Sequence, residues 1–97
     1  MKLFAFYCRD GEHGEVFRDH SQEALLAHFE EHARDFVVAG PLAKGDKIVG
    51  SLLVIKGSDE ADARAKLESV PYFSMGVWQS IRADEFRPLF GEWATGD

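Results

Sequence analysis

Two histidines, His28 and His32, stand four residues apart in the segment HFEEH, a spacing that could hold a metal ion on one face of a helix. A zinc-protease helix needs a glutamate directly after the first histidine, and Phe29 occupies that position. No convincing third ligand follows along the chain. We therefore predict two histidines on the solvated edge of a helix and no metal site.

A second group of potential ligands lies in the polar segment RDGEHGEVFRDH, residues 9–20. It contains Asp10, Glu12, His13, Glu15, Asp19 and His20. Their spacing matches neither a calcium-binding loop nor a zinc motif. We interpret the whole segment as a solvated loop between a strand and a helix.

Cys8 is the only cysteine, so no intramolecular disulfide is possible and nothing indicates an oxidising compartment. A neighbouring cation, Arg9, could lower the pKa of its thiol and make it a nucleophile. A small buried hydrophobic residue at the end of an apolar strand is the interpretation we prefer. The glycines near Pro41 match no phosphate-binding motif, and no cofactor is predicted.

The overall composition fits one small domain spanning residues 1–97. The chain is 45% hydrophobic and 12% aromatic, which is ample for a core. Its 11 Lys+Arg against 17 Asp+Glu give a net charge of −6, which argues against nucleic acid and anionic membranes as partners. No apolar run has the length of a membrane helix or a signal-peptide core. We expect a soluble, cytoplasmic protein.

The elements that must position these residues follow the order βαββαβ. Strands are expected in residues 3–8, 36–39, 48–55 and 75–83, with a turn at Gly45-Asp46. The first helix should begin near Asp19 or Ser21 and carry Leu25, Leu26, Phe29, Ala33 and Phe36 on one face. The second should be capped within Gly57-Ser58-Asp59, carry Ala63, Leu67 and Val70 on its inner face, and end at Pro71.

The order predicts an α+β, ferredoxin-like fold, in which a four-stranded antiparallel sheet has both helices on one face. The segments Phe4–Tyr7 and Leu52–Ile55 are continuously apolar rather than alternating, so the second face of the sheet must also be covered. We infer a homodimer that packs sheet against sheet. The alternative is that the aromatic tail alone, with Phe86, Leu89, Phe90 and Trp93, folds over this face.

Five short motifs are spread over nearly the whole chain, and each occurs once. They are YCRD at 7–10, AGPL at 39–42, GSLLVI at 50–55, PYFSMG at 71–76, and Ile81 leading towards Arg87-Pro88. In these motifs the chain resembles the YciI-like (YCII-related) domain family, a branch of the dimeric α+β barrel proteins. The resemblance implies a ferredoxin-like monomer, a homodimer built through the sheets, and a cleft beside the first helix where small molecules bind.

The resemblance also implies an acid–base pair, a histidine and an aspartate, that this chain lacks. The matching positions hold Leu25 and Val70, and the family's arginine falls on Gln22. Because both members of the pair are apolar here, we expect a cleft lined by Leu25, Val70 and Tyr72. Polar contacts are expected from Arg18, Gln22 or Ser51, and the predicted ligand is a small apolar or aromatic molecule.

Three functions remain open from the sequence. The first is a YciI-like homodimer that binds a small molecule without catalysis, or with weak catalysis. The second is a lyase or isomerase acting on a small cyclic or aromatic compound, with its acid–base group rebuilt from His20, His28 or Tyr7. The third is a dimerisation or interaction module without a ligand.

Overall fold

The computed structural model describes residues 1–91, so Trp93 and the end of the predicted aromatic tail lie outside the described part. The elements are β1 (Lys2–Asp10), α1 (Gly14–Glu31), β2 (Phe36–Lys44), β3 (Lys47–Gly57), α2 (Glu60–Glu68), α3 (Pro71–Ser74) and β4 (Trp78–Phe86). Apart from the one-turn helix α3, this is the predicted βαββαβ order. The ferredoxin-like α+β fold class is confirmed.

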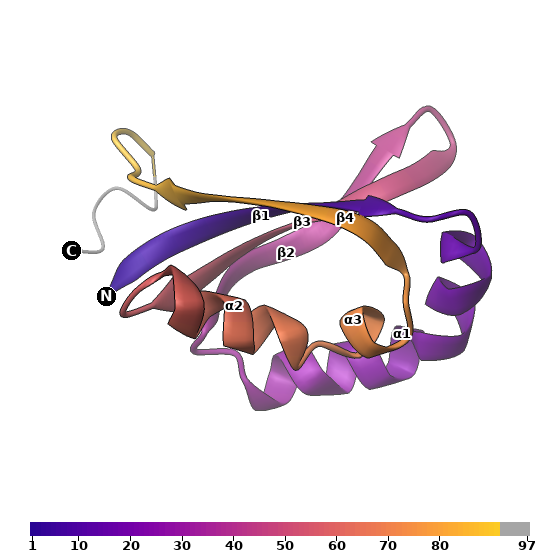
Figure 1. The fold of residues 1–97 in the computed structure, drawn as a ribbon, viewed down its shortest axis with the longest axis horizontal. Coiled ribbons are helices and arrows are strands. Elements are labelled where there is room, and N and C mark those ends of the chain that lie inside the picture. Colours follow the sequence, from indigo (N-terminus) through magenta and orange to yellow (C-terminus); the bar gives the residue numbers. More distant parts are fainter. Residues whose placement is uncertain (92–97) are drawn as a thin grey trace.

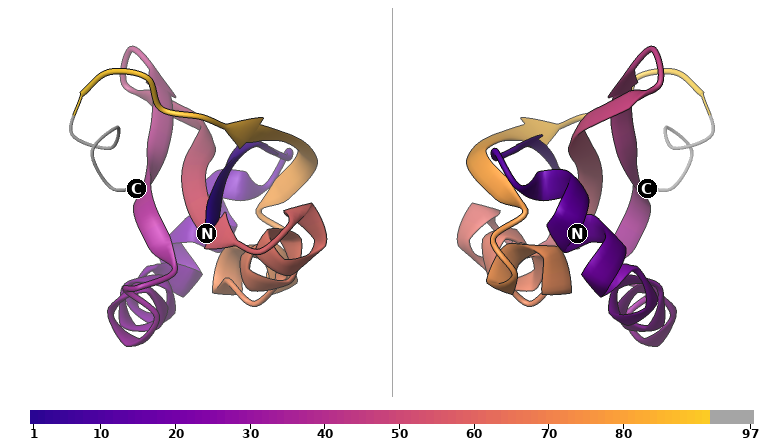
Figure 2. Two further views of the ribbon diagram at one scale, coloured as in Figure 1. Left: turned by 90° about the vertical axis from the view of Figure 1, so that its left-hand side faces the viewer. Right: turned by 90° about the vertical axis from the view of Figure 1, so that its right-hand side faces the viewer.

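The four strands form one antiparallel sheet in the order β2-β3-β1-β4. All three helices lie on the same side of this sheet (Figure 1). Seen end-on, α1 lies below the β2 side, whereas α2 and α3 lie below the β4 side (Figure 2). The helices therefore form one layer in which α1 runs beside α2 and α3.

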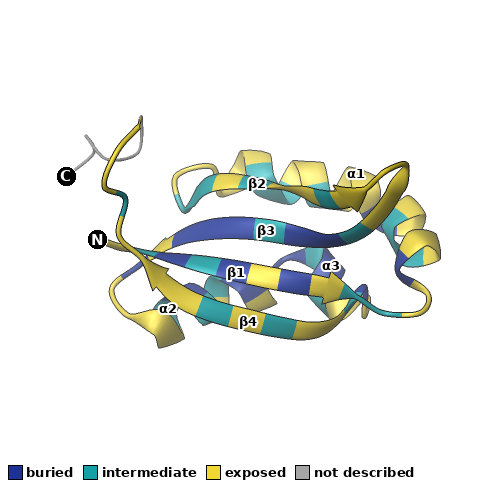
Figure 3. Ribbon diagram, turned by 90° about the horizontal axis from the view of Figure 1, so that it is seen from above, coloured by how far each residue is buried: buried dark blue, intermediate teal, exposed yellow. Residues whose placement is uncertain are grey.

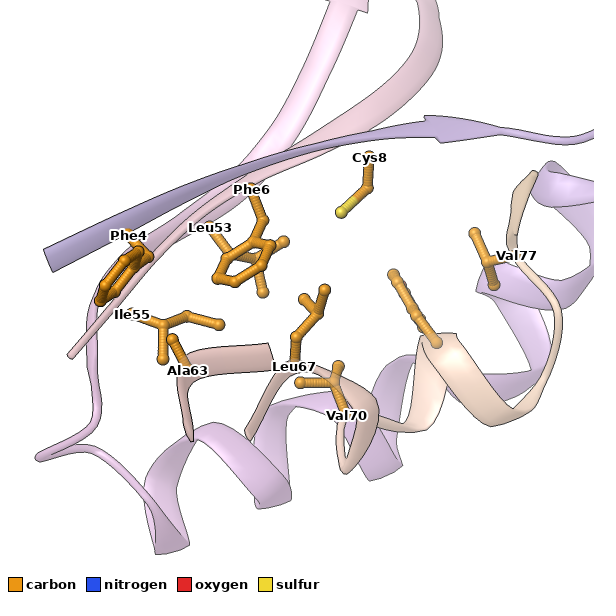
Figure 4. Packing of buried hydrophobic residues seen from close by; sticks show 10 residues of the cluster. Phe4, Phe6, Cys8, Leu53, Ile55, Ala63, Leu67, Val70 and Val77 are labelled. Atoms are coloured by element: carbon orange, nitrogen blue, oxygen red, sulfur yellow. The ribbon is translucent and has the colours of Figure 1, made fainter. Parts of the chain in front are cut away.

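The core fills the space between the sheet and the helices. Alternate residues of β1 point inward because side chains of a strand alternate between its faces, and Phe6 is fully buried there opposite Leu53 of β3. The buried cluster consists of Phe4, Phe6, Cys8, Leu53, Ile55, Ala63, Leu67, Val70, Tyr72 and Val77 (Figure 4). Each fully buried Phe, Leu, Ile or Val contributes about 1.5–3 kcal/mol relative to an exposed one. This burial holds the sheet and helix layers together.

The first helix begins earlier than predicted, at Gly14, and the predicted loop over residues 9–20 is wrong. The buried stripe of α1 passes through Ser21, which is only 4% exposed. Its hydroxyl donates a hydrogen bond of 2.7 Å to the carbonyl oxygen of Phe17, so a polar residue is tolerated inside. Because serine interrupts the apolar periodicity, the sequence pattern hid the first two turns.

The apolar face predicted for this helix is only partly correct. Leu25 and Phe29 pack against the core, as expected. Leu26 is 54% exposed, and Ala33 lies beyond the end of the helix. Phe36 already belongs to β2.

The second helix is capped as predicted, because the Asp59 side chain accepts a 2.8 Å hydrogen bond from the backbone N–H of Asp62. It ends at Glu68, so Val70 and Pro71 lie beyond it, and the prediction that it carries Val70 and ends at Pro71 is wrong in these bounds. Pro71 instead opens α3. A proline is suited to the first turn of a helix because its missing N–H has no partner there. The residue before it, Val70, is extended, as a following proline requires.

All four strands differ from the predicted bounds, β1 and β3 by one or two residues at each end and β2 and β4 by more. β2 continues past Ala39 through Pro41 to Lys44, where Gly45, at φ 61°, begins the turn into β3. Proline is tolerated in β2 because that strand is at the edge of the sheet. β4 begins at Trp78, after Gly76 at φ 78°, rather than at Met75.

The face of the sheet away from the helices, here called the open face, is apolar along its centre. Tyr7 pairs with Leu52 across β1 and β3, and Val38 pairs with Val54 across β2 and β3. Tyr7 and Val38 are 42% and 38% exposed, and Figure 3 shows how exposure grows from β3 towards β2 and β4. The predicted second apolar face is therefore present.

The aromatic tail does not cover the open face as far as the structure describes it. Leu89 and Phe90 are 94% and 96% exposed. The alternative in which the tail alone covers the sheet is therefore not supported by residues up to 91.

Within residues 1–91, no helix combines the length and the apolar composition needed to cross a bilayer.

Candidate functional site

A cavity of about 370 Å³ lies between α1, the neighbouring strands β2 and β3, and the corner formed by α3 and β4. This volume is in the range of small-molecule sites, about 300–1,000 Å³. Its walls are mostly apolar, with Leu25 and Phe29 from α1, Pro41 from β2, and Ile48 and Leu53 from β3. The cavity is thus open to small molecules with an apolar body.

The structure brings five of the six predicted site residues around this one cavity. Arg18, Gln22, Leu25, Ser51 and Tyr72 all line it, although they come from α1, β3 and α3. Val70 is not among the lining residues. It is fully buried in the core, where it continues the inward stripe of α2 (Figure 4).

The polar end of the cavity is organised by an ion pair between Arg18 and Asp10. Arg18 Nε and Nη2 donate to the two carboxylate oxygens of Asp10 at 2.7 and 2.8 Å. The two side chains are only 13% and 9% exposed. Burial lowers the pKa of the Arg18 guanidinium, but the hydrogen bond and charge of Asp10 outweigh burial and raise this pKa overall. Arg18 is therefore a fixed cation with a fixed partner.

A glycine at the start of α1 makes room for this pair. A Cβ on Gly14 would stand 2.8 Å from Oδ2 of Asp10, too close for any other residue unless the carboxylate moved. Gly14 begins the helix, three residues separate it from the end of β1 at Asp10, and Arg18 follows one turn later. The junction between β1 and α1 thus places both partners.

Ser51 extends the ion pair into a connected cluster. Its Oγ accepts a hydrogen bond from Arg18 Nη2 at 2.9 Å and another from Trp78 Nε1 at 3.3 Å. We call the group Asp10, Arg18, Ser51, Tyr72 and Trp78 the Arg18 cluster. It joins three strands and two helices at one end of the cavity.

The aromatic members of the Arg18 cluster form one wall of the site. The Arg18 guanidinium carbon lies 5.0 Å from the centre of the Tyr72 ring, a distance that allows a cation–π interaction. The rings of Tyr72 and Trp78 meet edge to face, with centroids 6.1 Å apart. The first turn of α3 therefore holds the Tyr72 ring against the Arg18 guanidinium.

The sequence alone does not indicate a binding role for two members of this cluster. Asp10 appears there as a possible metal ligand in a loop and as part of the YCRD motif, and no motif points to Trp78. Asp10 lies eight residues before Arg18, and Trp78 lies 27 residues after Ser51. An aspartate at the end of a strand with an arginine in the first turns of the next helix was the one available signal. The misplaced start of α1 concealed it.

The proposed acid–base residues lie elsewhere among the described residues. Tyr7 is on the open face, and neither His20 nor His28 lines the cavity. The ring centroids of His28 and His32 lie 4.4 Å apart, and Nε2 of His28 is 3.2 Å from Ser69 Oγ. Burial, followed by the charge of His32, lowers the pKa of His28. Within residues 1–91, no three His, Cys, Asp or Glu side chains are placed to hold a metal ion.

Cys8 is fully buried in the core. Burial raises the pKa of its thiol to about 12, and the nearby Arg64 and Arg18 charges do not offset this. At neutral pH the group is an uncharged thiol, which is a poor nucleophile. The position behaves as a small hydrophobic residue, in agreement with the preferred interpretation.

No protein-family model matches the chain, and no curated protein matches it either. Two solved structures resemble it in fold. One is 5-chloro-2-hydroxyhydroquinone dehydrochlorinase (TftG) from Burkholderia phenoliruptrix AC1100 in complex with 2,5-dihydroxybenzoquinone, at TM-score 0.73 and 21% identity over 87% of this chain and 92% of that chain. The other is a candidate antibiotic biosynthesis monooxygenase from Nitrosomonas europaea, at TM-score 0.53 and 12% identity over 93% of this chain and 100% of that chain.

Both neighbours have the dimeric α+β barrel fold. The likeness agrees with the sheet order and helix placement described above. At these identities it concerns the fold alone.

Proposed function

We propose that this chain is a YciI-like homodimer that binds a small apolar or aromatic molecule in the cavity beside α1. The observation that carries the proposal is the Arg18 cluster, a connected polar group at one end of an otherwise apolar cavity. Small-molecule sites typically combine apolar walls with a few placed polar groups. The neighbour in complex with 2,5-dihydroxybenzoquinone supports a ring-shaped ligand for this fold.

The site favours binding over proton transfer. Leu25, at the position of the family's histidine, has no titratable group, and Val70 is buried away from the cavity. Arg18 and Asp10 neutralise each other through two hydrogen bonds. A group engaged in this way orients a ligand better than it donates or accepts a proton.

The homodimer is part of the same proposal. The open face carries apolar side chains along β1, β2 and β3, and Tyr7 and Val38 remain substantially exposed. A second sheet at about 10 Å would cover them. The dimeric fold of the structural neighbours supports this arrangement.

A thermal-shift screen against small aromatic acids, phenols and lactones tests the proposal. A ligand at ~100 times its dissociation constant should stabilise the protein by roughly 2.7 kcal/mol, which is several degrees in Tm. The variant Leu25→Asp places a charge in the apolar wall and should lose the shift. Val16→Asp is the matched control, because Val16 is 53% exposed on α1 and does not line the cavity.

The outcomes separate the candidate functions. A shift that is kept in Val16→Asp and lost in Leu25→Asp supports binding in this cavity. A shift that survives Leu25→Asp places the ligand elsewhere. No shift with any compound favours the interaction module without a ligand.

A further inference from the structure

Ser51 accepts two hydrogen bonds from groups that can only donate. A guanidinium nitrogen and an indole N–H have no acceptor capacity, so Ser51 Oγ is the acceptor in its contacts with Arg18 Nη2 and Trp78 Nε1. A serine hydroxyl offers two lone pairs and one hydrogen. Arg18 Nη2 shares its two hydrogens among Ser51 Oγ, Asp10 Oδ1 and the Gly50 carbonyl oxygen, at 2.8–2.9 Å. Neither Arg18 nor Trp78 can accept the hydroxyl hydrogen of Ser51.

The hydrogen of this hydroxyl has no acceptor among the described residues. Ser51 is 6% exposed and lines the cavity. The hydroxyl hydrogen is therefore available to an acceptor inside the cavity and to little else.

The charges around the cavity disfavour an anionic acceptor. The positive charge of Arg18 is matched by Asp10 at 2.7 Å, and Asp19 adds a negative charge to the lining. No other Lys or Arg is among the described lining residues. A carboxylate would lose hydration here without gaining a net opposite charge, whereas a neutral carbonyl oxygen carries a smaller desolvation cost.

We infer that Ser51 determines the specificity of the cavity, and that its ligand is a cyclic ketone or quinone whose carbonyl oxygen accepts a hydrogen bond from Ser51 Oγ. The ring of such a ligand would occupy the apolar part of the cavity along Leu25 and Phe29. This inference rests on the proposed function and narrows it from small apolar or aromatic molecules to those with a neutral acceptor on the ring.

Three probes with one ring system test the inference on the wild-type protein by isothermal titration calorimetry. They are 1-tetralone, with a ring carbonyl, tetralin, without any oxygen, and the anion of tetralin-1-carboxylic acid. The ketone should bind about threefold to tenfold more tightly than tetralin, the range for one neutral hydrogen bond. The carboxylate should bind more weakly than the ketone.

Variants at Ser51 assign this preference to one hydroxyl. In Ser51→Ala the affinity for 1-tetralone should fall to that for tetralin, while tetralin binding stays within about twofold of wild type. Ser51→Thr keeps the hydroxyl and should restore the preference for the ketone. The wild-type comparison decides the question even where a variant fails to fold.

Each other outcome has a distinct meaning. Equal affinity of wild type for 1-tetralone and tetralin overturns the inference and leaves the proposed function standing. Tightest binding of the carboxylate also overturns it, because Arg18 would then act as an anion receptor. Binding of none of the probes, together with a blank thermal-shift screen, contradicts the proposed function itself.

Discussion

Asp10 and Arg18 show how much of the site depends on a single pair of residues. With side chains 9% and 13% exposed, each is shielded from water and relies on the other for its charge balance. Asp10→Asn would leave the Arg18 charge with only neutral partners. We expect a loss of roughly 3 kcal/mol in the free energy of unfolding, as for breaking a buried ion pair. Urea denaturation measures it.

An exposed ion pair on α2 provides the control for this prediction. Arg64 and Glu68 form a pair whose side chains are 41% and 47% exposed. Glu68→Gln should therefore cost only about 0.3–0.5 kcal/mol. Equal losses in the free energy of unfolding of the two variants would contradict the argument that the Asp10–Arg18 pair stabilises the protein more because it is buried.

At the scale of elements, the packing of α1 against the end of α2 predicts a pH dependence. The pKa of His28 is lowered by burial and by His32, so the folded state resists its protonation. The unfolded chain binds that proton at its usual pKa of about 6.5. Stability should therefore be complete above this pH and decline as the pH falls below it.

His28→Gln should reduce the difference in the free energy of unfolding between about pH 7.5 and pH 5.5, because the titrating group is gone. Urea denaturation at the two pH values measures the difference. His20→Gln is the control, since His20 is exposed on the same helix. A pH dependence that is identical in wild type and His28→Gln would exclude His28 as its source.

The sequence was sufficient for the order of the elements but not for all of their bounds. The turn at Gly45-Asp46 and the cap at Asp59 are local signals, encoded within a few residues, and both are present in the structure. The start of α1 was hidden because a buried polar residue, Ser21, satisfies its own hydroxyl within the helix. Local periodicity cannot register a side chain that is buried and polar at once.

Most residues of the candidate site could be predicted from the sequence, but the hydrogen bonds that connect them could not. Five cavity residues follow from the resemblance to a family and from residue type. The bonds that organise them join Arg18 to Ser51, 33 residues apart, and Trp78 to Ser51, 27 residues apart. Such contacts depend on how β1, β3 and β4 align, which no short motif specifies.

At the scale of the whole molecule, the open face predicts a dimer that a single charge should disrupt. Tyr7 is 42% exposed at the centre of this face, opposite Leu52. Tyr7→Glu would bury a carboxylate between two sheets, which strongly disfavours association. We expect a dimer for wild type and a folded monomer for Tyr7→Glu in size-exclusion chromatography with light scattering.

The matched control is Val16→Glu, which introduces the same charge at an exposed apolar residue of α1. It should remain dimeric. A wild-type protein that is monomeric across the concentration range would refute the sheet-to-sheet dimer.

The proline in β2 has a consequence for how large such an assembly can grow. An edge strand ordinarily offers a row of N–H and C=O groups to which further strands can add without limit. Pro41 interrupts that row in one edge strand, and charged Arg82, Asp84 and Glu85 line the other, β4. Lateral growth into fibres is thus obstructed at both borders. Two copies of the chain can still associate through their open faces. Such a pair would cover both open faces and leave none for a third copy.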